Sequence, residues 1–366
     1  MKTKVCLMLT VVVLLVTCIG SVGVYALDTA PMNQAELIAE TWVNNNYGGY
    51  YDIRNLHSTL IKTVKTEDSV QYTIAITCDT RLKVKDAEEL PFIKGMRAEA
   101  ATRTSLSKAS STAIEAYVDE IEGYIGNYYP LSVDVVVEIG NSKKNEPATL
   151  YYQDVQATVL LPIEELKIDE AQMMSAGADM VDQLISFSNS ATRGYDAYDR
   201  IAARDYALTY SSNPTDCSDC GTTCGIRQDR TKWNNTDYPY IDNLKHADCA
   251  DYVSQAMYAG GIPIEAGVWQ RFYDGNNGWS WTSGAGLKNY MVNKGYWDLT
   301  TFDLCNAGNI IRWLSSSDSA NHVGMITLND TVTHRYTAHT SDRLNYLFTN
   351  SNYYQTNCEF YMIKFD

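Results

Sequence analysis

The spacing of hydrophobic residues over residues 28–190 predicts a mixture of helices and strands. Hydrophobic side chains recur at helical intervals in three segments, whereas in three others they alternate with polar residues or form β-branched runs. The expected helices are residues 35–45, 97–124 and 169–185, and the expected strands are residues 70–78, 131–139 and 150–161. This half of the chain is therefore expected to be an α+β unit.

The second half of the chain is likewise expected to contain helices and strands. A helix is expected to begin near Tyr198, and residues 248–261 (DCADYVSQAMYAGG) predict another that begins at Cys249. Asp248 is a favoured N-cap residue, and two glycines followed by a proline end the helical spacing. Residues 308–313, 322–328 and 336–340 predict three short strands, with His322 opening the second. A helix packed on an antiparallel sheet is the expected architecture.

The start of the chain has a different composition. Lys2 and Lys4 precede an apolar run, and Val24-Tyr25-Ala26 follows as a small-x-small sequence. This order predicts a secretory signal peptide over residues 1–26. The apolar run of about 15 residues is shorter than the roughly 20 that a spanning helix needs, so stable membrane insertion is not expected. A membrane anchor and a lipid-modified Cys18 are the alternatives. The protein is expected to be secreted, either extracellular or associated with a cell wall.

Composition indicates where the rest of the chain divides into domains, and charge indicates which classes of partner it can bind. A segment rich in Ser, Asn, Thr, Gly and Asp at residues 186–197 predicts a linker between an accessory α+β domain (27–190) and a second domain (191–366). The formal net charge is −15, and removing Lys2 and Lys4 with the signal peptide brings it to about −17. Such an acidic chain is a poor partner for nucleic acid. No cofactor is expected, and the oligomeric state is open.

The cysteine count predicts one free thiol. Seven of the nine cysteines lie beyond the signal peptide, and an odd number in an exported protein leaves one unpaired. Cys249 is the candidate, so the other six can form up to three disulfides. Cys217, Cys220 and Cys224 form a C-x2-C-x3-C motif that could also begin a metal site. No histidine follows at standard zinc-ligand spacing, so disulfides are favoured and no metal is expected.

A cysteine at a helix N-terminus and a histidine on a strand form a catalytic pattern. The free amides and the positive helix dipole at Cys249 are expected to lower the pKa of its thiol, and His322 can act as its base. A base needs a third group to orient it. His339 is the preferred candidate for that role and Asp342 the second. His246 and His334 flank loops and are expected at the surface.

These motifs carry a family resemblance over residues 196–366. Residues 198–203 (YDRIAA), 248–263 (DCADYVSQAMYAGGIP), 322–327 (HVGMIT) and 338–343 (AHTSDR) resemble, in this order, the putative amidase domain family of exported Gram-positive proteins. That family is similar to the NlpC-like cell-wall peptidases of the papain-like superfamily. The resemblance implies a papain-like fold with Cys249 as nucleophile, His322 as base and His339 as third residue. The chain departs from the family's usual Gly-Asp-Cys at Ala247, and from Gly-Asp at Asn309.

The sequence thus favours a secreted, cysteine-dependent amidase or peptidase that works through an acyl-enzyme. The resemblance implies peptide or peptidoglycan-like substrates, and leaves hydrolysis and acyl transfer equally open. Trp269, Trp279, Trp281 and Tyr290 lie between nucleophile and base, where they could line a cleft or fill a core. A non-catalytic binding or adhesion protein on a retired hydrolase fold is the alternative function.

Overall fold

The structure is a computed structural model that describes residues 31–140, 147–154, 156, 159–190, 198–239, 246–271, 278–314 and 322–364. The expected signal peptide and residues 191–197 of the expected linker lie outside the described residues, whereas residues 186–190 of that linker belong to a helix. Across the described part of the chain, no helix is long and apolar enough to cross a membrane.

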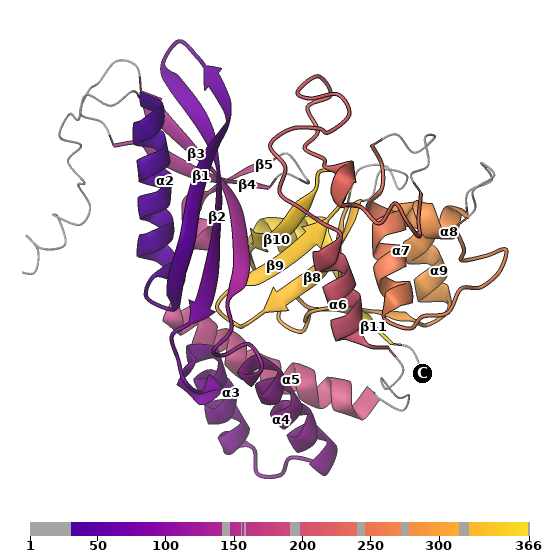
Figure 1. Ribbon diagram of the computed structural model, residues 1–366. Coiled ribbons are helices and arrows are strands. Elements are labelled where there is room, and N and C mark those ends of the chain that lie inside the picture. Colours follow the sequence, from indigo (N-terminus) through magenta and orange to yellow (C-terminus); the bar gives the residue numbers. More distant parts are fainter. Residues whose placement is uncertain are drawn as a thin grey trace, which may run out of the picture.

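The first half mixes helices and strands as its hydrophobic spacing predicts, but the long strand Tyr51–Lys65 was not among the expected elements (Figure 1). In chain order its elements are α2 (Pro31–Tyr47), β1 (Tyr51–Lys65), β2 (Ser69–Leu82), η1 (Ala87–Glu89), α3 (Pro91–Thr102), α4 (Lys108–Glu122), β3 (Tyr129–Gly140), β4 (Thr149–Asp154), β5 (Val159–Pro162), η2 (Ile163–Leu166) and α5 (Glu170–Ser190).

The second half begins with helices and ends with short strands. In chain order its elements are α6 (Arg200–Thr209), η3 (Arg230–Lys232), α7 (Cys249–Ala259), α8 (Trp279–Thr282), α9 (Gly284–Asn293), β6 (Trp297–Thr300), β7 (Ile310–Trp313), β8 (His322–Asn329), β9 (His334–Ala338), β10 (Arg343–Phe348), α10 (Asn352–Asn357) and β11 (Cys358–Ile363).

Two expected elements of the first half are each divided in the structure. The single helix expected over residues 97–124 is two helices, because Ser107 caps α4 by accepting a hydrogen bond from the Ser110 amide. Short hydroxyl side chains favour such caps over helix interiors. The strand expected over residues 150–161 is the hairpin of β4 and β5. Its turn is held by Asp154, whose carboxylate accepts from the Gln156 amide at 2.8 Å.

The strands form one mixed sheet that runs through both halves. The order is β1-β2-β3-β10-β9-β8-β7-β11-β6, with β4 and β5 added beside β3. All pairings are antiparallel except β3 with β10, which is parallel and rests on one residue pair, Ser132 and Tyr346. The expected α+β class with an antiparallel sheet is confirmed. The helix α2 packs on β1 and β2, whereas α6 and α7 pack on β8 (Figure 1).

The two halves share side chains as well as a sheet. Near the β3–β10 seam, the Tyr346 hydroxyl accepts from the Asp134 amide, and the Tyr152 hydroxyl donates to the Leu347 carbonyl at 2.7 Å. One hydrophobic cluster contains residues of β1–β5 together with residues of β7–β10, and a second surrounds α7. The expected arrangement of two separate domains is therefore not confirmed, because the main core is common to both halves.

His334 is buried at the start of β9, so the expectation of a surface histidine is wrong. Its ring lies between Phe302 and Phe348, with centroid distances of 3.9 and 5.7 Å. Burial lowers the pKa of His334 to about 3. In the unfolded chain this histidine takes up a proton near pH 6.5, whereas in the folded chain it stays neutral until about pH 3. The folded state therefore loses stability as the pH falls from about 6.5 towards 3.

Replacing His334 with leucine is expected to make the protein less sensitive to acid. Between pH 7.5 and pH 5 the free energy of unfolding of the wild type should fall by about 2 kcal/mol through this histidine, at 1.36 kcal/mol per pKa unit. The variant lacks the histidine and should lose none of this free energy. Urea unfolding at pH 7.5 and pH 5 measures the difference. The matched control is His57→Leu, at an exposed site on β1. Equal pH dependence of the His334 variant and the wild type would contradict the assignment.

Candidate functional site

The nucleophile candidate opens α7, as its sequence predicts. Cys249 is the first residue of the helix and is half-buried, while the apolar side of the helix lies in the second core. The helix ends at Gly260, where an added Cβ would lie 2.4 Å from the Tyr198 ring. Gly260 also accepts a backbone hydrogen bond from Asp199 at 2.8 Å. Close packing against the start of α6 thus fixes the helix that carries the thiol.

The helix that begins at Cys249 packs on β8. The charged form of the Cys249 thiol is favoured by the Val323 amide, by the Thr340 hydroxyl and by the Ala250 amide, which act to lower its pKa. Burial nevertheless raises the pKa of Cys249, and the nearby Asp248 carboxylate adds to the effect. The lowered pKa expected from the helix N-terminus is therefore wrong for the free protein, because desolvation outweighs these interactions.

His322 is the first residue of β8, opposite Trp313 on β7, as the sequence predicts. Its ring centroid lies 5.2 Å from that of Trp313. Nε2 is buried and has no hydrogen-bond partner among the described residues. Burial lowers the pKa of His322 to about 3, and the charge of His339 contributes in the same direction. The ring is therefore neutral near pH 7, with a nitrogen available to accept a proton.

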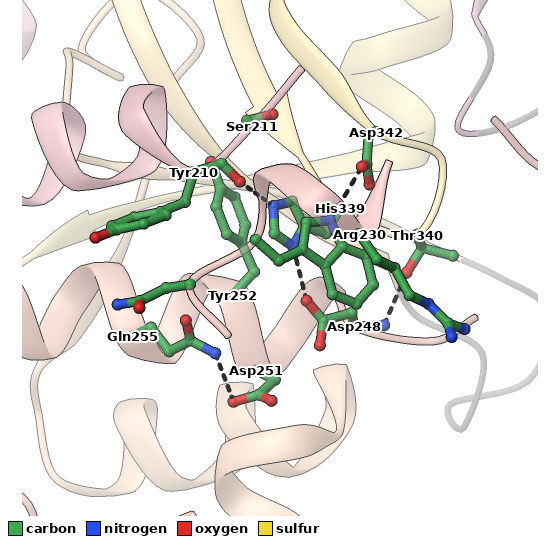
Figure 2. Close-up of polar contacts among 12 residues, drawn as sticks. Tyr210, Ser211, Arg230, Asp248, Asp251, Tyr252, Gln255, His339, Thr340 and Asp342 are labelled. Carbon is green, nitrogen blue, oxygen red and sulfur yellow. Dashed lines mark hydrogen bonds and ion pairs between the residues drawn. The ribbon is translucent and has the colours of Figure 1, made fainter. Parts of the chain in front are cut away.

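His339 lies just after β9, and its two ring nitrogens are both occupied (Figure 2). Nε2 lies 2.6 Å from the Tyr210 carbonyl oxygen, which can only accept, so this nitrogen carries a hydrogen. Nδ1 lies 2.7 Å from Asp248 Oδ2. The ring is stacked between Tyr252 and Trp233, with centroid distances of 3.7 and 4.7 Å. His339 thus has no free nitrogen to offer His322.

Asp248 has a different role from the one that its N-cap position predicts. Its side chain makes no capping hydrogen bond to α7, because the carboxylate contacts His339 instead. Burial raises the pKa of Asp248 and lowers the pKa of His339, so both shifts oppose an ionic pair. The first-turn amides of α7 are consequently left without a side-chain cap, next to the thiol of Cys249.

The second candidate for orienting His322, Asp342, is buried and holds a loop. Its carboxylate accepts from the Asp229 amide at 2.9 Å and from Trp233 Nε1 at 3.0 Å. Its own amide donates to the Arg227 carbonyl at 2.7 Å. Since Trp233 covers one face of His339, Asp342 supports His339 indirectly, through the loop of residues 227–233.

Thr340 is a site residue that the sequence did not indicate. Its backbone has φ of 83°, a left-handed conformation that a β-branched residue rarely adopts. Its hydroxyl accepts a hydrogen bond from the Asp248 amide at 3.1 Å and acts to lower the pKa of the Cys249 thiol. Backbone strain of this kind is common where a side chain is held for function. No local sequence pattern marks it, because its partners lie in a distant segment.

A buried ion pair on α7 was also not anticipated. Asp251 is fully buried and accepts hydrogen bonds from Arg271 Nε at 2.7 Å, from Trp281 Nε1 at 2.6 Å and from Gln255 at 3.1 Å. Trp269 and Trp281 are likewise fully buried, so they belong to the core and do not line a cleft. Trp279 is 58% exposed. It lines a surface hollow of about 280 Å³ over α8 and α9.

None of the seven described cysteines is in a disulfide, so the expected disulfides are not confirmed. Cys78, Cys305 and Cys358 are buried in the main core. The sulfurs of Cys217, Cys220 and Cys224 lie together in the loop between α6 and α7.

Alkylation of Cys249 by iodoacetamide is expected to accelerate with rising pH and to be still increasing near pH 9. The raised pKa keeps the thiol protonated at neutral pH, and only the thiolate reacts. Peptide mapping after short exposures at pH 6 to 9.5 measures this profile, with a cysteine-containing peptide as reference. A rate that levels off below pH 7 would instead reveal an activated thiolate and contradict the expectation.

The second half of the chain is similar to a known protein family. Residues 197–363 match the family model described as "Putative amidase domain". No curated protein and no solved structure matches the chain. The matched segment contains Cys249, His322 and His339. It indicates a hydrolase that acts on amide bonds.

Proposed function

We propose that the protein is a cysteine amidase in which Cys249 is the nucleophile and His322 the base. The observation that carries this proposal is the packing of α7, which begins at Cys249, against β8, which begins at His322. Val323 follows His322 directly, and its amide favours the charged form of the Cys249 thiol, as expected for a thiol beside this end of β8.

The proposed reaction begins from a neutral thiol and a neutral imidazole. As the sulfur attacks the amide carbonyl, the thiol proton moves to the free ring nitrogen of His322, and a tetrahedral oxyanion forms. The uncapped first-turn amides of α7 can stabilise that oxyanion. The C–N bond then breaks, and His322 gives the proton to the leaving amine. A water molecule releases the acyl group, again with His322 as base, and restores the thiol.

In this scheme His339 is a positioning residue that acts through Asp248. Nδ1 of His339 lies 2.7 Å from Oδ2 of Asp248, the residue before the nucleophile. The Tyr210 carbonyl and the stacked rings of Tyr252 and Trp233 fix the orientation of His339 itself. Thr340 joins the same group, because its hydroxyl accepts from the Asp248 amide and acts to lower the pKa of the thiol. Together they fix where Cys249 lies relative to β8.

The proposed substrate is a peptide of the peptidoglycan type, and the proposed location is outside the cell. The expected signal peptide and the resemblance to exported amidases support both proposals. The high acidity of the chain favours short peptide segments over bulk anionic wall polymer, which it would repel.

The test is digestion of purified peptidoglycan by the mature chain, with the soluble products identified by mass spectrometry. The proposal predicts new free amino and carboxyl ends within stem or cross-bridge peptides. These should be absent when Cys249→Ala is used at equal concentration. If peptidoglycan stays intact while other peptides are cleaved, the proposed substrate class is refuted, but the proposed cysteine mechanism is not. Cleavage that persists in the variant would refute the mechanism.

A further inference from the structure

The loop between α6 and α7 collects three cysteine sulfurs that the proposed reaction does not use. The sulfurs of Cys217, Cys220 and Cys224 all lie within 4.8 Å of one another. Tetrahedral zinc binds thiolate sulfur at about 2.3 Å, which separates two such sulfurs by about 3.8 Å. The three thiols are therefore already close to the spacing of a zinc site, and none of them is in a disulfide.

A histidine near the end of the same loop lies beside this cluster. Nδ1 of His246 is 4.0 Å from the sulfur of Cys217. The side chain of Gln228, which is fully buried, lies 3.2 Å from the same nitrogen and donates to the His246 carbonyl at 3.2 Å. A bond to an ion would replace the Gln228 contact at Nδ1 after a small rotation of the ring. His246 lies outside the group of three sulfurs that are all within 4.8 Å of one another, but beside Cys217 it is placed to turn toward them as a candidate fourth ligand.

The backbone around the cysteines has the turns that a compact metal site needs. Gly221 and Gly225 directly follow two of the cysteines and have φ of 56° and 70°. An added Cβ at either glycine would meet nothing within 4 Å, so glycine is needed there for its conformation and not for space. Cys217 and Gly221 also exchange two backbone hydrogen bonds, at 3.2 and 2.8 Å. The loop is thus folded back on itself without a disulfide.

We propose that Cys217, Cys220, Cys224 and His246 bind one zinc ion as a closed, structural site. Four protein ligands leave no open position for catalysis, and three thiolates with one imidazole are a common structural set. His246 precedes the nucleophile helix by one short turn, so the ion would tie the cysteine loop to the start of α7. The site is independent of the proposed amidase function, because Cys249 is not a ligand.

The first experiment measures zinc in the purified chain. The protein is prepared without a histidine tag or chelator, and metal is quantified by mass spectrometry. We expect about one zinc per chain in the wild type and in the matched cysteine control Cys249→Ala, and almost none in Cys224→Ala. Cobalt substitution of the wild type should give the intense visible bands of tetrahedral thiolate coordination, with a charge-transfer band in the near ultraviolet.

The second experiment tests the histidine. Competition with a chromogenic chelator should show that His246→Ala binds zinc at least tenfold more weakly than the wild type, because one of four ligands is lost. If a cysteine variant fails to fold, zinc is instead removed from the wild type and then restored. Near-ultraviolet circular dichroism recorded at each step provides the same information. Loss of tertiary signal on removal and its return with zinc is the expected result.

Three outcomes would overturn the proposal. One is a wild type without zinc in which two of the loop cysteines form a disulfide, seen as a mass lower by two hydrogens. Another is equal zinc content in Cys224→Ala, which would mark the metal as adventitious. The last is unchanged affinity in His246→Ala, which would remove the histidine from the ligand set. Failure of the amidase proposal would leave all of these zinc measurements unchanged.

Discussion

Alanine in place of Cys249 is expected to reduce amide hydrolysis by at least about 10³-fold, because the variant lacks the thiol that forms the acyl-enzyme in the proposed reaction. Cys249 is half-buried at the edge of the second core, whereas Tyr252 and Val253 are fully buried in it, so removal of the sulfur should preserve folding. Initial rates of peptide cleavage, measured at equal concentrations of folded protein, give the ratio.

The matched control for this variant is Cys78→Ala. Cys78 is buried in β2, on the opposite side of the β3–β10 seam, so its loss should leave the rate of cleavage nearly unchanged. Equal rates for the wild type and Cys249→Ala would show that another residue performs the chemistry.

Asp251→Ala is expected to lower the free energy of unfolding by about 3–5 kcal/mol, the usual cost of breaking a buried ion pair by removing one partner. The substitution leaves the Arg271 guanidinium, whose side chain is 5% exposed, without its carboxylate. It also removes the acceptor for the indole nitrogen of Trp281. Urea unfolding followed by tryptophan fluorescence measures the loss.

The double variant Asp251→Leu with Arg271→Met separates charge from packing. Removing both charges should recover much of the lost stability, since no buried charge is left unpaired. If Asp251→Ala alone were as stable as the wild type, the buried pair would not contribute to folding as its contacts indicate.

The sequence predicted the parts of this molecule that depend on neighbouring residues. Helical spacing after Asp248 predicts a helix that begins at Cys249, and alternation predicts a strand over residues 70–78, which lies within β2 with Tyr72, Ile74 and Ile76 buried. Both predictions are confirmed, because local periodicity determines them. The pairing of β3 with β10 could not be predicted, since it joins residues far apart in the chain through a single register position.

The candidate site shows the same limit. The sequence names Cys249, His322 and His339 as candidates, but it does not reveal that His339 contacts Asp248 and Tyr210, because these contacts depend on tertiary packing. The sequence also predicted the wrong direction for the pKa shift of Cys249, which is raised and not lowered. The helix dipole can be recognised from sequence, whereas the burial that outweighs it cannot.

A simple ester such as p-nitrophenyl acetate shows whether Cys249 can be acylated and needs no knowledge of the natural substrate. If Cys249 is the nucleophile, we expect a burst of one nitrophenolate per chain, an acetyl group on the Cys249 peptide, and loss of both in Cys249→Ala. A wild type without a burst, or a burst that survives in Cys249→Ala, would contradict the assignment of Cys249 as the nucleophile.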